Sequence, residues 1–175
     1  MRRRVIAKFK DESASAFGET FWRERWRRCC RAQPSLSLWR MNRPIRGSCL
    51  CGGVRFEVDP PFVQASHCHC DRCRKHSGTA VCTQARVRRE QFRLLQGEQL
   101  IKVYGKGEGA VKAFCMNCGS SLFGGDWPDG PQVSIRMGAF DDDPGIRPQF
   151  DTFVDDRAPW DTITDNLPQY SERRT

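Results

Sequence analysis

Short stretches of alternating apolar and polar residues recur along the chain from residue 41 onward. Val54, Phe56 and Val58 alternate with Arg55 and Glu57, which is the period of two expected for a half-buried β-strand. Comparable patterns predict further strands at residues 62–66, 79–87, 101–104, 111–114, 122–123, 133–137 and 150–154. Gly- and Pro-rich turns separate these stretches, and there is almost no helical periodicity. The pattern therefore indicates a mainly β domain.

Two local features qualify this pattern. Residues 90–95 are predicted to form one helical turn that Gly97 closes. Pro159 and Trp160 are predicted to end the compact part of the domain.

The N-terminal segment at positions 1–40 differs in composition from the rest of the chain. It carries 11 Lys/Arg and 4 Asp/Glu, whereas positions 41–175 carry 18 and 17, so most of the net charge of +8 lies in this extension. Residues 17–28 are compatible with a basic amphipathic helix that touches a membrane surface or a polyanion. The alternatives are a disordered arm or a misassigned start codon. We therefore expect a basic extension at 1–40, with nucleic-acid binding disfavoured except through the extension.

The cysteine content points to metal and not to disulfides. No run approaches the roughly 18 apolar residues of a membrane span, and no apolar segment of a secretory signal follows the basic N-terminus. Ten cysteines without a secretory address favour a reducing compartment. We therefore expect a cytoplasmic location and metal ligands among the thiols.

A C-x-C-x-x-C run is the most distinctive motif. Cys68, Cys70 and Cys73 lie too close in sequence to pair with one another as disulfides, but their sulfurs can converge on one soft metal ion. Zinc is favoured because thiolates select it and a tetrahedral centre tolerates tight spacing.

Two further cysteine pairs lie on either side of this run. Cys49 and Cys51 lie between glycines, and Cys115 and Cys118 are followed by Gly119. The glycines allow tight turns that bring backbone N–H groups toward sulfur. Together the two pairs supply four thiolates, enough for a closed structural zinc site that staples the start of the domain to a strand much further along the chain.

Seven thiols remain when Cys29, Cys30 and Cys82 are set aside, and seven divides into four and three. The three-thiol run is then either an open site or one that a side chain completes. The candidates for completing it are His76, His67, His69 and Cys82. Spacing alone does not decide between these alternatives, because structural sites are saturated whereas catalytic ones keep a free position.

An open three-thiolate zinc binds an incoming thiol and favours its deprotonation. Such a site suits the addition of a thiol to a small carbonyl compound, or the reverse reaction. Arg72, Arg74 and Lys75 either attract a carboxylate-bearing thiol such as glutathione or form an ordinary solvated face.

Three segments together resemble the glutathione-dependent formaldehyde-activating family, which includes centromere-protein-V-like domains. They are G-S-C-L-C-G-G-V-R-F-E-V, C-H-C-D-R-C-R-K-H-S-G and F-C-M-N-C-G-S-S-L-F. The resemblance extends from about Arg43 to Tyr170, which implies a zinc-binding domain at 41–170 and a tail at 171–175. One departure is Asp151, at a position where many members carry histidine.

The resemblance implies a zinc-stapled β-tent of two small antiparallel sheets. It implies a structural zinc held by Cys49, Cys51, Cys115 and Cys118, and a catalytic zinc held by Cys68, Cys70 and Cys73. It further implies carbon–sulfur lyase activity that joins glutathione and formaldehyde into S-hydroxymethylglutathione. The competing hypothesis is a non-catalytic zinc module that binds protein or nucleic acid.

Overall fold

The computed structural model describes residues 43–105 and 110–174. The predictions about the basic extension at residues 1–40 lie outside the described residues. The proposed domain boundaries at residues 41–170 and 171–175 stay predictions.

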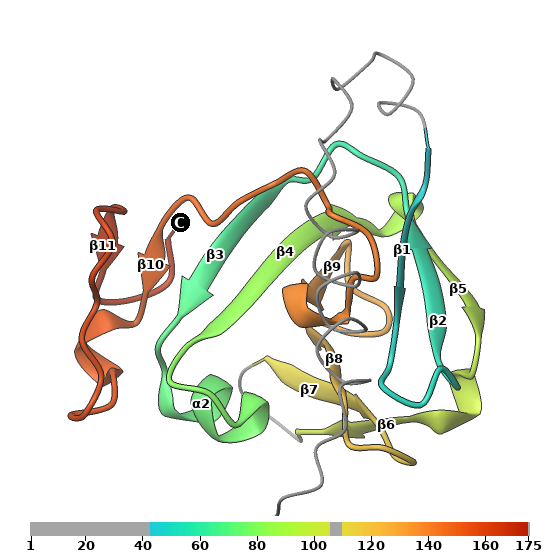
Figure 1. Ribbon diagram of the computed structural model, residues 1–175, viewed down its shortest axis with the longest axis horizontal. Coiled ribbons are helices and arrows are strands. Elements are labelled where there is room, and N and C mark those ends of the chain that lie inside the picture. Colours follow the sequence, from blue (N-terminus) through green and yellow to red (C-terminus); the bar gives the residue numbers. More distant parts are fainter. Residues whose placement is uncertain (1–42, 106–109, 175) are drawn as a thin grey trace, which may run out of the picture. The chain divides into compact units, whose positions relative to one another are not determined.

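A three-stranded antiparallel sheet forms the smaller layer, drawn on the right of Figure 1. Its strands run in the order β1 (Ile45–Ser48), β2 (Arg55–Val58) and β5 (Phe92–Gln96). β1 and β2 form a hairpin in which Gly47 lies opposite Phe56. The turn of this hairpin carries Cys49 and Cys51.

An eight-stranded sheet forms the larger layer. Its strands, in spatial order, are β11 (Gln169–Tyr170), β10 (Asp151–Thr152), β3 (Gln64–Cys68), β4 (Cys82–Arg88), β9 (Gln132–Arg136), β8 (Ser121–Gly125), β7 (Val111–Cys115) and β6 (Ile101–Tyr104). The prediction of a mainly β fold with two sheets is confirmed. The larger sheet is mixed, because β10 runs parallel to both β3 and β11 while the other strands pair antiparallel.

The main core lies between the two sheets and is built on aromatic rings. Phe56 of β2 packs against Phe92 of β5 and Phe123 of β8, with ring centroids 5.6 and 5.3 Å apart. Trp127 stacks on Phe123 at a centroid distance of 4.3 Å. Aliphatic side chains of β2, β4, β8 and β9 complete this core. Burial of such apolar surface is the main driving force for bringing the sheets together.

Alternation along the central strands gives the larger sheet two different faces. On β9, Val133 and Ile135 belong to the main core, whereas Ser134 and Arg136 alternate with them and point to the opposite face. β4 repeats this alternation and places Gln84 directly opposite Arg136. Both Ser134 and Arg136 are nevertheless buried. The second face of the sheet is therefore a covered polar surface.

The predicted helical turn at residues 90–95 is wrong for most of its length. Only Arg89–Gln91 forms a 3₁₀ turn, and the following residues form β5. Phe92 is buried in the main core, and Leu94 pairs with Phe56 of β2. Packing in the core and pairing with β2 outweigh the weak local preference for a helical turn.

The C-terminal predictions also need correction. The predicted strand at residues 150–154 is reduced to the two residues of β10, because Phe153 adopts a left-handed backbone with φ of 57°. The predicted end of the compact part at Pro159 and Trp160 is wrong. The chain continues and returns as β11 beside β10.

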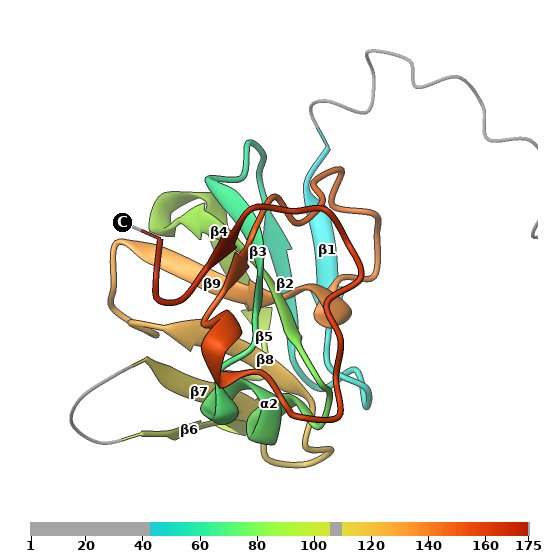
Figure 2. The same cartoon turned by 90° about the vertical axis from the view of Figure 1, so that its left-hand side faces the viewer.

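In the described part of the chain, one α-helix is present, α2 (Asp71–Ser77). It lies next to β7 in both views (Figures 1 and 2). It is too short for a 3.6-residue pattern to be recognised in the sequence. The 3₁₀ turns of the described residues are Arg89–Gln91, Glu98–Leu100, Met137–Ala139 and Val154–Asp156. No helix among these elements is long and apolar enough to cross a membrane.

The hairpin of β1 and β2 generates a prediction at Gly47. A Cβ atom there would lie 2.1 Å from Cζ of Phe56 and 2.5 Å from the carbonyl oxygen of Ala139. Both neighbours are held by the core, so Gly47→Ala is expected to lower the free energy of unfolding by about 1–3 kcal/mol. Urea denaturation of the zinc-loaded protein measures this change.

Gly138→Ala is the matched control. No atom lies within 4 Å of a Cβ built at Gly138, and its φ is outside the left-handed region. This control is expected to change stability by less than about 0.5 kcal/mol. Equal stability of the two variants would contradict the packing assigned to Gly47.

Candidate metal centres

Four cysteines from two distant segments form the first cluster. The sulfurs of Cys49, Cys51, Cys115 and Cys118 all lie within 4.8 Å of one another. The distance from Cys49 Sγ to Cys51 Sγ is 3.5 Å, and that from Cys51 Sγ to Cys115 Sγ is 3.9 Å. Tetrahedral zinc with Zn–S bonds of about 2.3 Å places its sulfur ligands about 3.8 Å apart. The four-thiol cluster therefore fits one zinc ion.

Local backbone geometry positions these four thiols. Gly52 and Gly119 have φ of 71° and 76°, and their N–H groups close tight turns onto the carbonyls of Cys49 and Cys115. The backbone N–H of Val54 donates to Cys49 Sγ at 3.2 Å. Hydrogen bonding from Ser120 helps to lower the pKa of Cys118 to about 5. Such donors stabilise thiolates, the form that binds a metal.

Three cysteines at the junction of β3 and α2 form the second cluster. Cys68 ends β3, Cys70 caps α2, and Cys73 lies in the first turn of that helix. Their sulfurs lie within 4.8 Å of one another, with 3.5 Å between Cys68 Sγ and Cys70 Sγ. The N–H of Cys73 donates to Cys70 Sγ, so the same hydrogen bond caps the helix and holds two of the thiols together. This three-thiol cluster also fits the ligand spacing of zinc.

None of the side chains considered as a fourth ligand joins this cluster. The rings of His76, His67 and His69 are instead engaged at 2.7–2.9 Å by Ser121 Oγ, Thr83 Oγ1 and Asp151 Oδ1 respectively. Cys82 packs beside Cys73 in a small apolar cluster but does not belong to the metal-ligand group. Over residues 43–105 and 110–174, no further His, Cys, Asp or Glu completes the set.

The ring of His76 contacts residues of β7 and β8 and does not belong to the three-thiol cluster. It stands edge-on to Phe114 with ring centroids 6.0 Å apart. Burial and the positive charges of Arg136 and Lys112 lower the pKa of His76 to about 4. The ring is therefore neutral near pH 7, and its environment is cationic.

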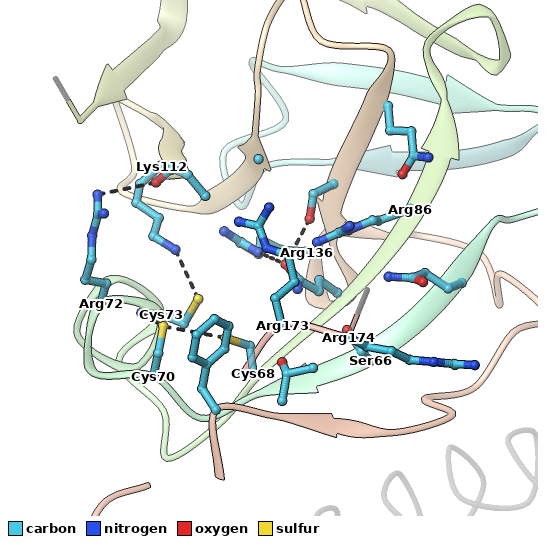
Figure 3. A pocket seen from close by; sticks show the side chains of 18 of the residues that line it. Ser66, Cys68, Cys70, Arg72, Cys73, Arg86, Lys112, Arg136, Arg173 and Arg174 are labelled. Carbon is cyan, nitrogen blue, oxygen red and sulfur yellow. Dashed lines mark hydrogen bonds between the residues drawn. The ribbon is translucent and has the colours of Figure 1, made fainter. Parts of the chain in front are cut away.

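A cavity of about 530 Å³ opens beside the three-thiol cluster, and the polar face of the larger sheet forms part of its wall (Figure 3). Its lining includes all three sulfur-bearing residues together with polar side chains of β3, β4 and β9. Three acidic residues line it: Asp71, Asp126 and Asp156. Six basic residues line it: Arg72, Arg86, Lys112, Arg136, Arg173 and Arg174. The cavity therefore suits an anionic ligand.

Lys112 connects this cavity to the three thiols. Its side chain is buried, and Nζ donates to Cys73 Sγ at 3.0 Å. The pKa of Cys73 is strongly lowered by hydrogen bonds from Cys68 and Cys70, and the charge of Lys112 acts in the same direction. Sequence reasoning considered Arg72, Arg74 and Lys75 but missed Lys112. The only signal in the sequence was that Lys112 alternates with Ala113 in a predicted strand, which places the two side chains on opposite faces.

Asp151 forms a buried pair with His69. Its Oδ1 lies 2.7 Å from Nε2 of His69, and both side chains are buried. In the sequence, His69 lies between Cys68 and Cys70. Asp151 belongs to β10, which runs parallel to β3. The pair therefore ties the C-terminal segment to the three-thiol cluster.

A comparison with known families identifies the segment that carries both clusters. The sequence model of a family described as "Glutathione-dependent formaldehyde-activating enzyme" matches residues 44–156, a segment that contains all seven clustered cysteines. A crystal structure of a Rhodobacter sphaeroides protein aligns with a TM-score of 0.47 and 24% identity, covering 59% of this chain and 92% of that chain. No curated protein matches the chain.

The two clusters predict different responses to loss of one thiol. Cys115→Ser removes a buried thiol from the four-thiol cluster, which connects the turn between β1 and β2 to β7. If this cluster holds a structural metal, cooperative folding is expected to be lost, at a cost of roughly 5–10 kcal/mol. Cys70→Ser removes a thiol at the cavity and is expected to leave the fold intact. Metal analysis and circular dichroism measure both effects, with two zinc ions expected in the wild type and one in Cys70→Ser. Similar stability of the two variants would contradict a structural role for the four-thiol cluster.

The buried pair predicts a second effect on stability. Asp151→Ala leaves the ring nitrogen of His69 buried without its acceptor, so the free energy of unfolding is expected to fall by about 1–3 kcal/mol. Asp129→Ala is the control, since Asp129 is exposed. Denaturation of zinc-loaded protein measures both. If the Asp151 variant is as stable as the control, the pair does not hold the C-terminal segment.

Proposed function

Because the chain belongs to the glutathione-dependent formaldehyde-activating enzyme family, we propose that it is a zinc-dependent carbon–sulfur lyase. Its substrate would be the adduct of a glutathione-like thiol with a small aldehyde. One observation carries this proposal. Three thiols meet at the wall of a cationic cavity, and no fourth protein ligand joins them in the described part of the chain. That arrangement is typical of a metal site that leaves one position for substrate.

In the proposed mechanism the two cysteine clusters have separate roles. Cys49, Cys51, Cys115 and Cys118 would hold a structural zinc, and Cys68, Cys70 and Cys73 would hold a catalytic one. Zinc bound by three thiolates supplies an electrophilic position that stabilises a substrate sulfur as thiolate. The protein's own contribution is to fix the three ligands at the end of β3 and the start of α2, facing the cavity.

The proposed reaction balances without a further reactant. In the direction of synthesis the thiol sulfur bonds to the carbonyl carbon, the π electrons move to the oxygen, and the thiol proton ends on that oxygen. The reverse reaction breaks the same carbon–sulfur bond. Lys112 would donate a hydrogen bond to the oxygen as negative charge develops there, because its ammonium group already lies 3.0 Å from Cys73 Sγ.

The oxidation state of the thiols bears on the proposed location. All eight cysteines of the described residues are free, and the proposed sites require seven of them, all but Cys82, as thiolates. We therefore extend the proposal to a reducing compartment, the cytoplasm.

Adduct exchange tests the proposed activity. Zinc-loaded wild-type protein is expected to accelerate exchange between glutathione, formaldehyde and S-hydroxymethylglutathione, measured by NMR exchange spectroscopy. Cys70→Ser is expected to lower kcat/KM by about 100-fold or more, because loss of metal activation removes several kcal/mol of transition-state stabilisation.

Cys30→Ser is the matched control, since it makes the same change outside the seven clustered thiols. This control is expected to exchange at the wild-type rate. If wild type and Cys70→Ser, both folded, exchange at the same rate, the three-thiol cluster is not catalytic and a non-catalytic zinc module becomes the better explanation.

A further inference from the structure

Arg136 is buried at the cavity with part of its hydrogen-bonding capacity unused. Its side chain is 5% exposed, and Nη1 donates to Gln84 Oε1 at 2.6 Å. Its Nε is buried and has no hydrogen-bond partner. Buried polar groups in proteins are nearly always satisfied, so an unused donor on a guanidinium group calls for an acceptor that a ligand supplies.

The sheet holds this guanidinium group in place. A Cβ atom at Gly124 of β8 would lie 2.4 Å from Nη2 of Arg136, so the absence of a side chain at Gly124 makes the space that the guanidinium group occupies. Ser134 also donates to Gln84 Oε1, at 2.9 Å, which fixes the amide that receives the hydrogen bond from Arg136. Arg136 is therefore preorganised and does not need to reorder when it binds an anion.

Arg86 adds a second positive charge on the same face. It lies on β4 opposite Ser134, next but one to Gln84, and its side chain faces the same cavity (Figure 3). Burial and the nearby charge of Arg173 lower the pKa of Arg86. Among the described residues, neither Arg86 nor Arg136 forms an ion pair with a carboxylate. The charge of Asp126 acts on Arg86 without forming an ion pair with it. Two adjacent, partly desolvated cations that lack a paired carboxylate favour binding of an anion.

We propose that Arg136 and Arg86 form a carboxylate-binding subsite that holds a carboxylate group of the substrate beside the three-thiol cluster. This inference rests on the proposed carbon–sulfur lyase function and names the substrate class that the cavity selects. Arginine binds carboxylates with paired, charge-assisted hydrogen bonds. Formaldehyde carries no charge, so the carboxylate belongs either to the thiol or to a carbonyl compound that carries an acid group.

Two kinetic comparisons identify the source of the carboxylate. In the first, formaldehyde is combined with 3-mercaptopropionate or with 2-mercaptoethanol, which differ in the acid group. In the second, 2-mercaptoethanol is combined with glyoxylate or with formaldehyde. The carboxylate is expected to raise kcat/KM about tenfold or more in one comparison, and this preference is expected to be lost in Arg136→Gln and in Arg86→Gln.

Controls separate the subsite from general effects of charge and folding. Arg147→Gln removes an exposed arginine that pairs with Asp143 elsewhere, and it is expected to keep the wild-type preference. Arg86→Gln changes a half-buried side chain and covers the case in which Arg136→Gln fails to fold. The proposal is overturned if neither comparison shows a preference, or if the preference survives in the folded arginine variants.

A binding measurement distinguishes failure of the subsite from failure of the proposed function. The probe is γ-glutamyl-2-aminobutyryl-glycine, which is glutathione with a methyl group in place of the thiol. If the thiol is the source, calorimetry is expected to show similar binding to wild type and Cys70→Ser, and binding at least about tenfold weaker in Arg136→Gln. Such binding without adduct exchange would uphold the subsite and refute the lyase. Exchange that is indifferent to carboxylates would uphold the lyase and refute the subsite.

Discussion

The architecture depends on four sulfur atoms that bring together two segments lying far apart in the sequence. Cys49 and Cys51 belong to the hairpin of the smaller sheet, and Cys115 ends a strand of the larger one. Because their sulfurs lie within 4.8 Å of each other, a metal ion there would join the two sheets. The aromatic core alone gives a small domain limited stability, so this cross-link would be a main constraint on how the two layers are held together.

The larger sheet serves two purposes because its faces differ. One face carries Val133 and Ile135 into the aromatic core, and the other carries Ser134 and Arg136 into the cavity. Residues of opposite character can alternate because successive side chains of a strand point to opposite sides. The same strands therefore stabilise the fold and supply the binding surface. This explains why Ser134 and Arg136 of β9 are buried without belonging to the core.

Much of the fold and of the candidate site could be predicted from the sequence, for identifiable reasons. Strands with one apolar face, such as residues 54–58, and cysteines at fixed spacing are local signals, so both were found. β5 was mistaken for a helical turn because its apolar residues follow no clear period and its pairing with β2 is non-local. α2 was missed because it is too short to show a period, and its cap is a cysteine already assigned to metal.

The chemistry of the cavity was harder to predict, because it arises from residues that only the sheet brings together. Lys112 and Arg136 look like solvated charges in the sequence, and nothing local places either beside a thiol. Their burial follows from register: Lys112 pairs with Gly124, and Gly124 with Ser134, across three adjacent strands. The histidines that were considered as metal ligands instead connect elements of the fold, as His69 does with Asp151.

Strand β7 connects the two cysteine clusters. Cys115 enters the four-thiol cluster from one face of this strand, while Lys112 donates to Cys73 from the other. A metal that fixes Cys115 would therefore also fix the backbone that presents Lys112, so the four-thiol site would contribute to the geometry of the cavity without touching a ligand there.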